Sequence, residues 1–278
     1  MERIASGYRL AEAPVAIAGG GVAFSDVLGG GVRRWDPRTG EVEVVIPKRR
    51  GVGGMALHAD GGLVVSGRDV SHVRDGKSRA LYDPATDPGV TGLNDLTVTP
   101  DGRVVVGRLR FHPFAGEAPV PGEFVEVAAD GTTTTVLEGV EWANGCAFSA
   151  DGSTFYGCDY HRGVVLAAGR GADGDYGPGR VAVTSPTGAV DGMAVDEDGG
   201  LWVALGPSAT VGRFTPDGRL DIEVEVPAAF VASLCFGGTD GRDLFVTTME
   251  DPQGPGGDGA VFRTRAPVAG APVAAVTG

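Results

Sequence analysis

Apolar and polar residues alternate in short runs along the whole chain, and a tight turn separates many of these runs. The stretch Ala189–Ala204, AVDGMAVDEDGGLWVA, shows the pattern in full: an alternating run, an Asp-Gly turn and a second apolar run. Alternation at a period of two residues predicts a half-buried β-strand, and Asp-Gly between two such strands predicts a hairpin. We therefore expect antiparallel β-structure built from hairpins.

The hairpin pattern occurs six times, at intervals of 41–50 residues. The other five copies are Ala11–Asp26, Val52–Gly67, Gly92–Gly107, Trp142–Cys158 and Val231–Thr247. Repeats of about 40–50 residues, each made of several short strands, are typical of a β-propeller. The sequence thus predicts an all-β fold: a six-bladed β-propeller of four-stranded antiparallel blades around a central channel, with residues 1–278 as a single domain. The final segment, Pro272–Val276, is expected to pair with a distant part of the chain, which leaves no free sheet edge.

One position in each repeat, seven residues before the turn, carries most of the candidate chemistry. These positions hold Glu12, Gly53, Asn94, Asn144, Asp191 and Ser233. Equivalent positions on the inner strands of a propeller converge on one axis, so these side chains are expected to meet. An alternative stays open for each polar residue: it satisfies backbone groups at the start of a strand and does nothing more.

Two carboxylates and an amide, from Glu12, Asp191 and Asn144, form an all-oxygen ligand set. Such a set suits a hard divalent cation, with calcium first and magnesium or manganese next. Zinc is a further possibility, although no histidine occupies any of the six positions, which argues against a typical catalytic zinc site. The sequence therefore predicts one divalent metal ion as cofactor.

Composition and charge restrict the possible partners and the compartment. The net charge of −13 argues against nucleic-acid binding, because phosphate contacts need a basic face. The three cysteines form no dense framework, which favours a reducing compartment, and no signal peptide is visible, so we expect a cytoplasmic protein. No run of about 18 apolar residues predicts a membrane span. The oligomeric state is left open.

The remaining motifs are few. His58, His72 and His161 are expected to be surface or loop residues, and no serine lies in a recognisable nucleophile setting. Two glycine- and proline-rich stretches, Phe111–Gly122 and Gly254–Gly257, are predicted loops that could close over a site.

At the level of whole motifs, the chain resembles the senescence marker protein/gluconolactonase/luciferin-regenerating enzyme family over almost its full length. The matching pieces are Glu12-Ala13-Pro14, Asn94-Asp95 with VTPDGR after it, NGCAFSADGSTFYGCD, VDGMAVDEDGGLWVA and SLCFGGTDGRDLFVT. The resemblance implies that Glu12, Asn144 and Asp191 bind one divalent metal. It also implies that Asn94 contacts substrate or metal-bound water, and that the substrate is a small molecule, in many members a lactone.

Two departures from the family pattern bear on the substrate. The usual Glu-Gly-Pro-x-Trp is Glu-Ala-Pro-Val-Ala here, and the arginine that sugar lactonases often carry two residues before the motif asparagine is replaced by Gly92. Arg68, Arg108, Arg110 or His112 are candidates to line the mouth of the site in its place, although we expect each of them first as a surface residue.

Taken together, the residues and the resemblance predict a metal-dependent hydrolase of a cyclic ester. The metal would polarise the lactone carbonyl, Asp191 would act as ligand and general base for the attacking water, and Asn94 would orient the substrate. Two alternatives remain: an enzyme of the same fold that acts on a non-sugar substrate of one pathway, and a calcium-binding or scaffold propeller without turnover.

Overall fold

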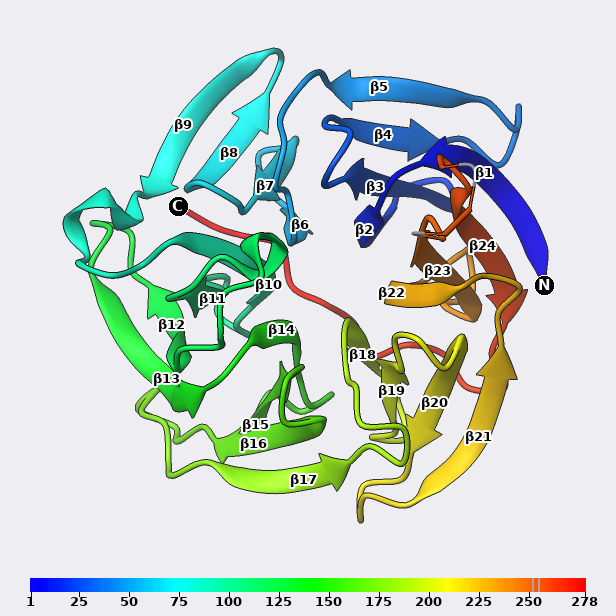
Figure 1. Ribbon diagram of the computed structural model, residues 1–278. Coiled ribbons are helices and arrows are strands. Elements are labelled where there is room, and N and C mark those ends of the chain that lie inside the picture. Colours follow the sequence, from blue (N-terminus) through cyan, green and yellow to red (C-terminus); the bar gives the residue numbers. More distant parts are fainter. Residues whose placement is uncertain (252, 255) are drawn as a thin grey trace. The chain divides into compact units, whose positions relative to one another are not determined.

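The computed structural model describes residues 1–251, 253–254 and 256–278, and its strands form six antiparallel sheets of four strands each (Figure 1). The chain divides into two compact units of three sheets. This confirms the predicted fold class, an all-β chain of six four-stranded propeller blades. Whether residues 1–278 act as a single domain stays a prediction.

The first unit comprises Met1–Val52 and Asp191–Pro272. One of its sheets contains β2 (Ala11–Ile17), β3 (Gly21–Asp26), β4 (Val32–Trp35) and β5 (Val42–Ile46). A second contains β18 (Met193–Val195), β19 (Leu201–Ala204), β20 (Thr210–Phe214) and β21 (Leu220–Glu225). The third contains β22 (Phe230–Gly237), β23 (Asp243–Met249), β24 (Gly259–Arg265) and β1 (Glu2–Tyr8).

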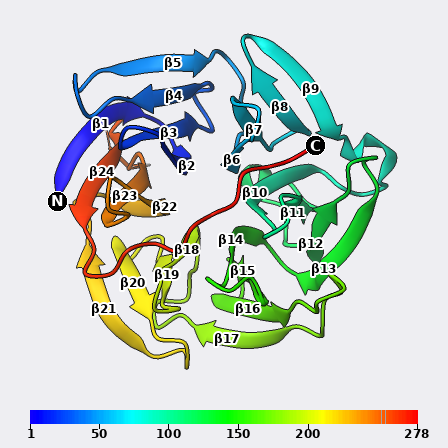
Figure 2. The same cartoon turned by 180° about the vertical axis from the view of Figure 1, so that it is seen from behind.

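The second unit comprises Gly53–Val190 and Val273–Gly278 (Figure 2). Its first sheet contains β6 (Met55–Leu57), β7 (Leu63–Val65), β8 (Val70–Arg74) and β9 (Lys77–Tyr82). The next contains β10 (Gly92–Val98), β11 (Val104–Leu109), β12 (Gly122–Val127) and β13 (Thr133–Val140). The last contains β14 (Ala143–Phe148), β15 (Thr154–Asp159), β16 (Val164–Gly169) and β17 (Arg180–Thr184). Two 3₁₀ helices, η1 (Pro84–Thr86) and η2 (Pro113–Ala115), lie in its loops.

The first two strands of every sheet form the hairpin that the sequence pattern predicts. Glycines of the Asp-Gly turns have the positive φ angles that such turns require, for example 88° at Gly102 and 80° at Gly199. The side chains between neighbouring sheets form the core. In the first unit Trp202, Leu234 and Phe262 pack in one cluster, and in the second unit Phe124 and Phe155 pack in another, all of them 3% exposed or less.

Both ends of the chain pair with distant segments. The N-terminal stretch before the first hairpin forms a strand of its own, β1, which pairs with β24 as the fourth strand of its sheet. At the other end, Val276 pairs in parallel with His58 of the second unit, as a distant partner for this segment predicts. His58 is buried, at 5% exposed, whereas we expected a surface or loop residue; the centroid of its ring lies 3.7 Å from that of His72, on which it stacks.

No helix in the described part of the chain has the length and apolar character needed to cross a membrane. The predicted loop Gly254–Gly257 includes Pro255, which lies outside the described residues.

Candidate metal and substrate site

Three of the predicted site residues, Glu12, Asn94 and Asn144, lie where the first strand of a sheet is irregular. The pairing of β2 with β3 shifts register between Glu12 and Val15, and that of β10 with β11 shifts between Leu93 and Leu96. The same irregularity occurs in β14, between Ala143 and Cys146, which spans Asn144. A β-bulge redirects a side chain out of the regular alternation and is common beside active sites.

The sequence carries a signal for one of these bulges that we did not use. Pro14 lies within β2, and proline inside a sheet is largely confined to edges and bulges because it cannot donate to the ladder. Ala13, between Glu12 and Pro14, has a φ of 50°, a value uncommon for a residue other than glycine. The local backbone at Glu12 is thus set by its own sequence.

The first unit contributes the two predicted carboxylates. Glu12 is 7% exposed and Asp191 is 6% exposed, so both acids lie inside the protein. Glu12 Oε2 accepts a hydrogen bond of 2.6 Å from the Ala13 backbone N–H. The Asp191 backbone N–H donates to Ala204 O at 2.8 Å, which fixes this residue just before β18.

Gly192 allows the backbone beside Asp191 to pack closely. A Cβ atom there would lie 2.5 Å from the Cα of Ser233 on the neighbouring strand β22, closer than real Cβ atoms approach. The backbone N–H of Gly192 also donates to Ala232 O at 2.8 Å. The glycine after Asp191 is therefore a packing requirement, and only glycine fits without a shift of β22.

The second unit contributes the two predicted amides. Asn94 Nδ2 donates to Ala143 O at 3.0 Å, the carbonyl of the residue before Asn144. A Cβ atom at Gly53, the equivalent position of the preceding sheet, would lie 3.3 Å from Asn94 Cα and would clash with Asn94 Oδ1. Gly53 thus leaves the space that the Asn94 amide occupies.

Asn144 is the second buried amide among the predicted site residues. It is 5% exposed and directly follows Ala143, whose carbonyl accepts the Asn94 amide. An amide oxygen is a suitable ligand for a hard cation. Its burial and residue type therefore fit the predicted role of a metal ligand.

Asp95 is a further buried acid whose importance the sequence did not reveal. It is 8% exposed, and its Oδ2 has no hydrogen-bond partner among the described residues. Burial raises the pKa of Asp95 to about 7. Its charge, after burial itself, also raises the pKa of the Cys146 thiol, so Cys146 is not an activated nucleophile.

The basic candidates for substrate contact have other partners. Arg110 makes a two-pronged ion pair with Glu123, with Nε–Oε2 at 3.0 Å and Nη2–Oε1 at 2.7 Å. Arg108 is buried, contrary to our expectation of a surface residue, and its Nη1 lies 2.7 Å from Asp87 Oδ2. Both guanidinium groups therefore form ion pairs with acidic residues of the second unit.

Two other candidates lie at the surface. Arg68 has a side chain that is 94% exposed, with its Nη2 3.6 Å from Asp69 Oδ2. His112 precedes η2, is exposed, and donates its backbone N–H to Glu117 Oε2 at 2.7 Å. A substrate contact by Arg68, Arg110 or His112 stays a prediction.

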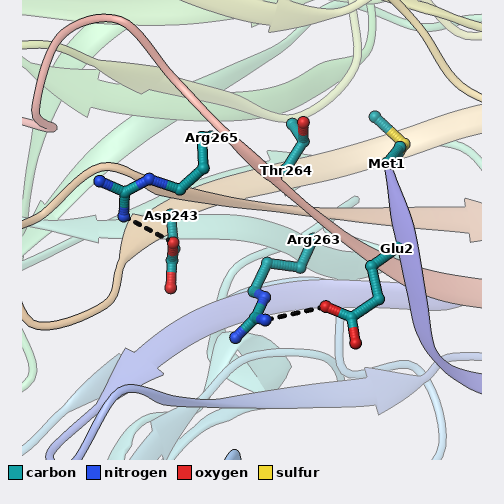
Figure 3. A pocket seen from close by; sticks show the side chains of 6 residues that line it. All are labelled: Met1, Glu2, Asp243, Arg263, Thr264 and Arg265. Carbon is teal, nitrogen blue, oxygen red and sulfur yellow. Dashed lines mark hydrogen bonds and ion pairs between the residues drawn. The ribbon is translucent and has the colours of Figure 1, made fainter.

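A hollow on the first unit lies away from these chemical groups. It is lined by Met1, Glu2, Asp243, Arg263, Thr264 and Arg265 (Figure 3). Arg263 Nη2 contacts Glu2 Oε2 and Arg265 Nη1 contacts Asp243 Oδ1, both at 2.8 Å, so its charges pair with one another. Neither Glu12 nor Asp191 lines it.

The donor set fits a hard cation. Two buried carboxylates and one buried amide offer oxygen ligands, which calcium, magnesium and manganese prefer. In the described residues no three His, Cys, Asp or Glu side chains gather as a metal cluster, and the predicted ligand set includes the amide of Asn144.

Residues 10–250 match the SMP-30/Gluconolactonase/LRE-like region. A pentonolactonase of Haloferax volcanii is 33% identical over 241 residues, which cover 84% of this chain and 79% of that protein. A 6-deoxy-6-sulfogluconolactonase of Pseudomonas putida is 28% identical over 260 residues, covering 89% of this chain and 87% of that protein. The chain therefore belongs to the SMP-30/gluconolactonase/LRE-like family, as its motifs predict.

The fold is shared with solved structures. A luciferin-regenerating enzyme superposes with a TM-score of 0.88 and 22% identity, covering 99% of this chain and 98% of that one. This similarity shows that the two proteins share a fold. The lactonase activities named above are those of the two relatives.

Proposed function

We propose that this protein is a divalent-metal-dependent hydrolase of a cyclic ester. Two relatives of nearly the same length are named lactonases, and both carry sequence identity across most of the chain. The observation that carries the metal is the burial of the Asn144 amide together with the carboxyl groups of Glu12 and Asp191.

In this proposal Glu12, Asn144 and Asp191 hold the cation, and calcium is the first candidate because the ligands are all oxygen. The bound ion supplies Lewis-acid polarisation of the lactone carbonyl. Asp191 also acts as general base: it takes one proton from the attacking water as the new C–O bond forms. It returns that proton to the ring oxygen when the C–O bond of the ring breaks.

Asn94 would position the substrate. Its Nδ2 is held by Ala143 O, which leaves Oδ1, in the space beside Gly53, as the acceptor for a substrate hydroxyl or for the attacking water. A fixed amide costs little reorganisation during the reaction, and this favours orientation by Asn94.

A second candidate is an enzyme with the same residues that acts on a non-sugar substrate. Gly92 favours it, because this position offers no side chain and a Cβ atom there would meet nothing within 4 Å. The space at the start of β10 is open to a substituent of the substrate.

The compartment is part of the same proposal. All three cysteines are free, and free thiols suit the reducing cytoplasm.

The test is hydrolysis of a panel of lactones, followed by proton release, with each of Ca²⁺, Mg²⁺, Mn²⁺ and Zn²⁺ and with chelator. Turnover that chelator abolishes and one cation restores supports the proposal. A protein that binds calcium in calorimetry and hydrolyses none of the panel would instead be the calcium-binding or scaffold propeller.

A further inference from the structure

Three aromatic rings form a continuous ladder in the second unit. The rings of Phe111 and Trp142 meet edge to face, with centroids 5.5 Å apart and an interplanar angle of 88°. The rings of Trp142 and Tyr160 lie 4.6 Å apart with an angle of 52°. No part of the sequence pattern predicted this cluster, because its members come from three different loops.

The ladder lies at the same end of the sheets as the two amide residues, Asn94 and Asn144. Phe111 follows the end of β11, Trp142 precedes β14, and Tyr160 follows β15. The Trp142 carbonyl accepts the Tyr160 backbone N–H at 3.0 Å.

The ladder is also joined directly to the amide positions. The residue after Trp142 is Ala143, whose carbonyl accepts the Asn94 amide, and the next residue is Asn144. The Phe111 carbonyl accepts the hydroxyl of Thr91, which lies next to Gly92, at 2.7 Å. Aromatic surface and amide groups thus belong to one local structure.

Two of the three rings reach the surface. Phe111 is 2% exposed, whereas Trp142, the middle ring, and Tyr160 are partly exposed. The other two tryptophans, Trp35 and Trp202, are buried at 5% and 0% exposure. Partly exposed aromatic side chains beside polar groups are the usual lining of small-molecule sites.

The charged groups that adjoin the ladder are paired with each other. Arg110, the residue before Phe111, is held by Glu123. His161 Nε2, next to Tyr160, lies 3.7 Å from Glu141 Oε2. These charged groups are thus already satisfied, whereas the ring faces offer apolar surface to an apolar group.

We propose that Trp142 and Tyr160 form the wall that holds an apolar substituent, alkyl or aryl, on the lactone ring. The preferred substrate is then a lactone with a hydrophobic substituent. This inference rests on the proposed hydrolase and names the substrate class for that same site.

The experiment compares kcat/KM for γ-phenyl-γ-butyrolactone, γ-butyrolactone and glucono-δ-lactone, with calcium present. The wild-type protein should prefer the phenyl lactone. Trp142→Ala should lower the ratio of phenyl to unsubstituted lactone about tenfold, through a higher KM, because it removes a stacking face. Trp142→Phe should retain most of the ratio.

Two controls separate recognition from folding. Phe114→Ala removes a ring that is 68% exposed on the same loop and should leave the ratio unchanged. If Trp142→Ala does not fold, Tyr160→Leu replaces it. As an independent readout, 2-phenyltetrahydrofuran, which has no carbonyl to hydrolyse, should shift the tryptophan emission of the wild-type protein, and tetrahydrofuran should not.

The outcomes distinguish the two claims. Turnover with a ratio that Trp142→Ala and Tyr160→Leu leave unchanged, or a preference for gluconolactone, overturns the apolar-substituent inference and leaves the hydrolase standing. Absence of turnover with every lactone and every metal overturns the hydrolase, and the inference falls with it.

Discussion

The buried carboxyl group of Asp95 predicts a stability that falls as the pH rises. The Asp95 Oδ2 atom lacks a hydrogen-bond partner among the described residues. A Cβ atom at Gly54 would lie only 2.9 Å from the Asp95 Cα atom, so the backbone at Gly54 packs closely against Asp95. Burial raises the pKa of Asp95 from 3.8 to about 7. An acid with a raised pKa in the folded state favours folding only while it is protonated.

The sign follows from proton counts. Between about pH 4 and pH 7 the folded protein holds the Asp95 proton and the unfolded chain has lost it, so the free energy of unfolding falls as the pH rises through this window. One pKa unit corresponds to about 1.4 kcal/mol. The ionised Asp95 carboxylate therefore lowers the free energy of unfolding above pH 7 by on the order of 4 kcal/mol, relative to the protonated acid. Roughly 2–3 kcal/mol of this develops between pH 5 and pH 8.

Asp95→Asn removes the titration and keeps the shape. Relative to wild type, the variant should gain about 2–3 kcal/mol in unfolding free energy between pH 5 and pH 8. Any fixed cost of the buried amide cancels in this difference. Urea denaturation at the two pH values, in chelator so that no cation contributes, measures it.

The matched control is Asp130→Asn. Hydrogen bonds from Thr132 lower the pKa of the exposed Asp130 carboxyl, so this variant should show no gain at pH 8. If Asp95→Asn and wild type keep a constant stability difference from pH 5 to pH 8, Asp95 does not hold its proton in the folded state and the reasoning is refuted.

Three other variants test separate parts of the account. Asp196→Ala should lower the free energy of unfolding, measured in urea, by about 3–5 kcal/mol. The Arg213 Nε atom lies 2.6 Å from Asp196 Oδ2 in the wild-type protein, and the variant leaves this buried guanidinium without that partner. A loss below about 1 kcal/mol would mean that the ion pair is screened by solvent. Gly192→Ala should weaken calcium binding in calorimetry, since its Cβ would push against Ser233 beside Asp191, and unchanged affinity would contradict the packing argument. Gly92→Arg should fold normally, because a Cβ atom there meets nothing, and should raise kcat/KM for gluconolactone; a loss of folding would show that the space is not open.

The repeating hairpins were predictable because their signal is local. Each Asp-Gly turn and each alternating run lies within about 16 residues, so the sequence carries the period, the turn and the register of the six equivalent positions together. The placement of Glu12, Asn94 and Asn144 on the first strands of their sheets follows from that register.

The structural features that we did not predict from the sequence depend on contacts between residues far apart in the chain. The pairing of β1 with β24 joins residues more than 250 positions apart, and nothing in Glu2–Tyr8 specifies that partner. His58 pairs with Val276 at the other end of the chain, and the Asp95 backbone packs closely against Gly54, which precedes a different sheet. The aromatic ladder likewise unites three loops that share no local motif.

The most direct test of the central claim is calcium titration of lactone hydrolysis by the wild-type protein and by Asp191→Asn. Chelator should abolish wild-type turnover, and calcium should restore it. Asp191→Asn should lose at least about a hundredfold in kcat, as expected when a general base is removed, and should bind calcium more weakly. Full activity and full calcium affinity in Asp191→Asn would contradict the assignment of this residue as ligand and base.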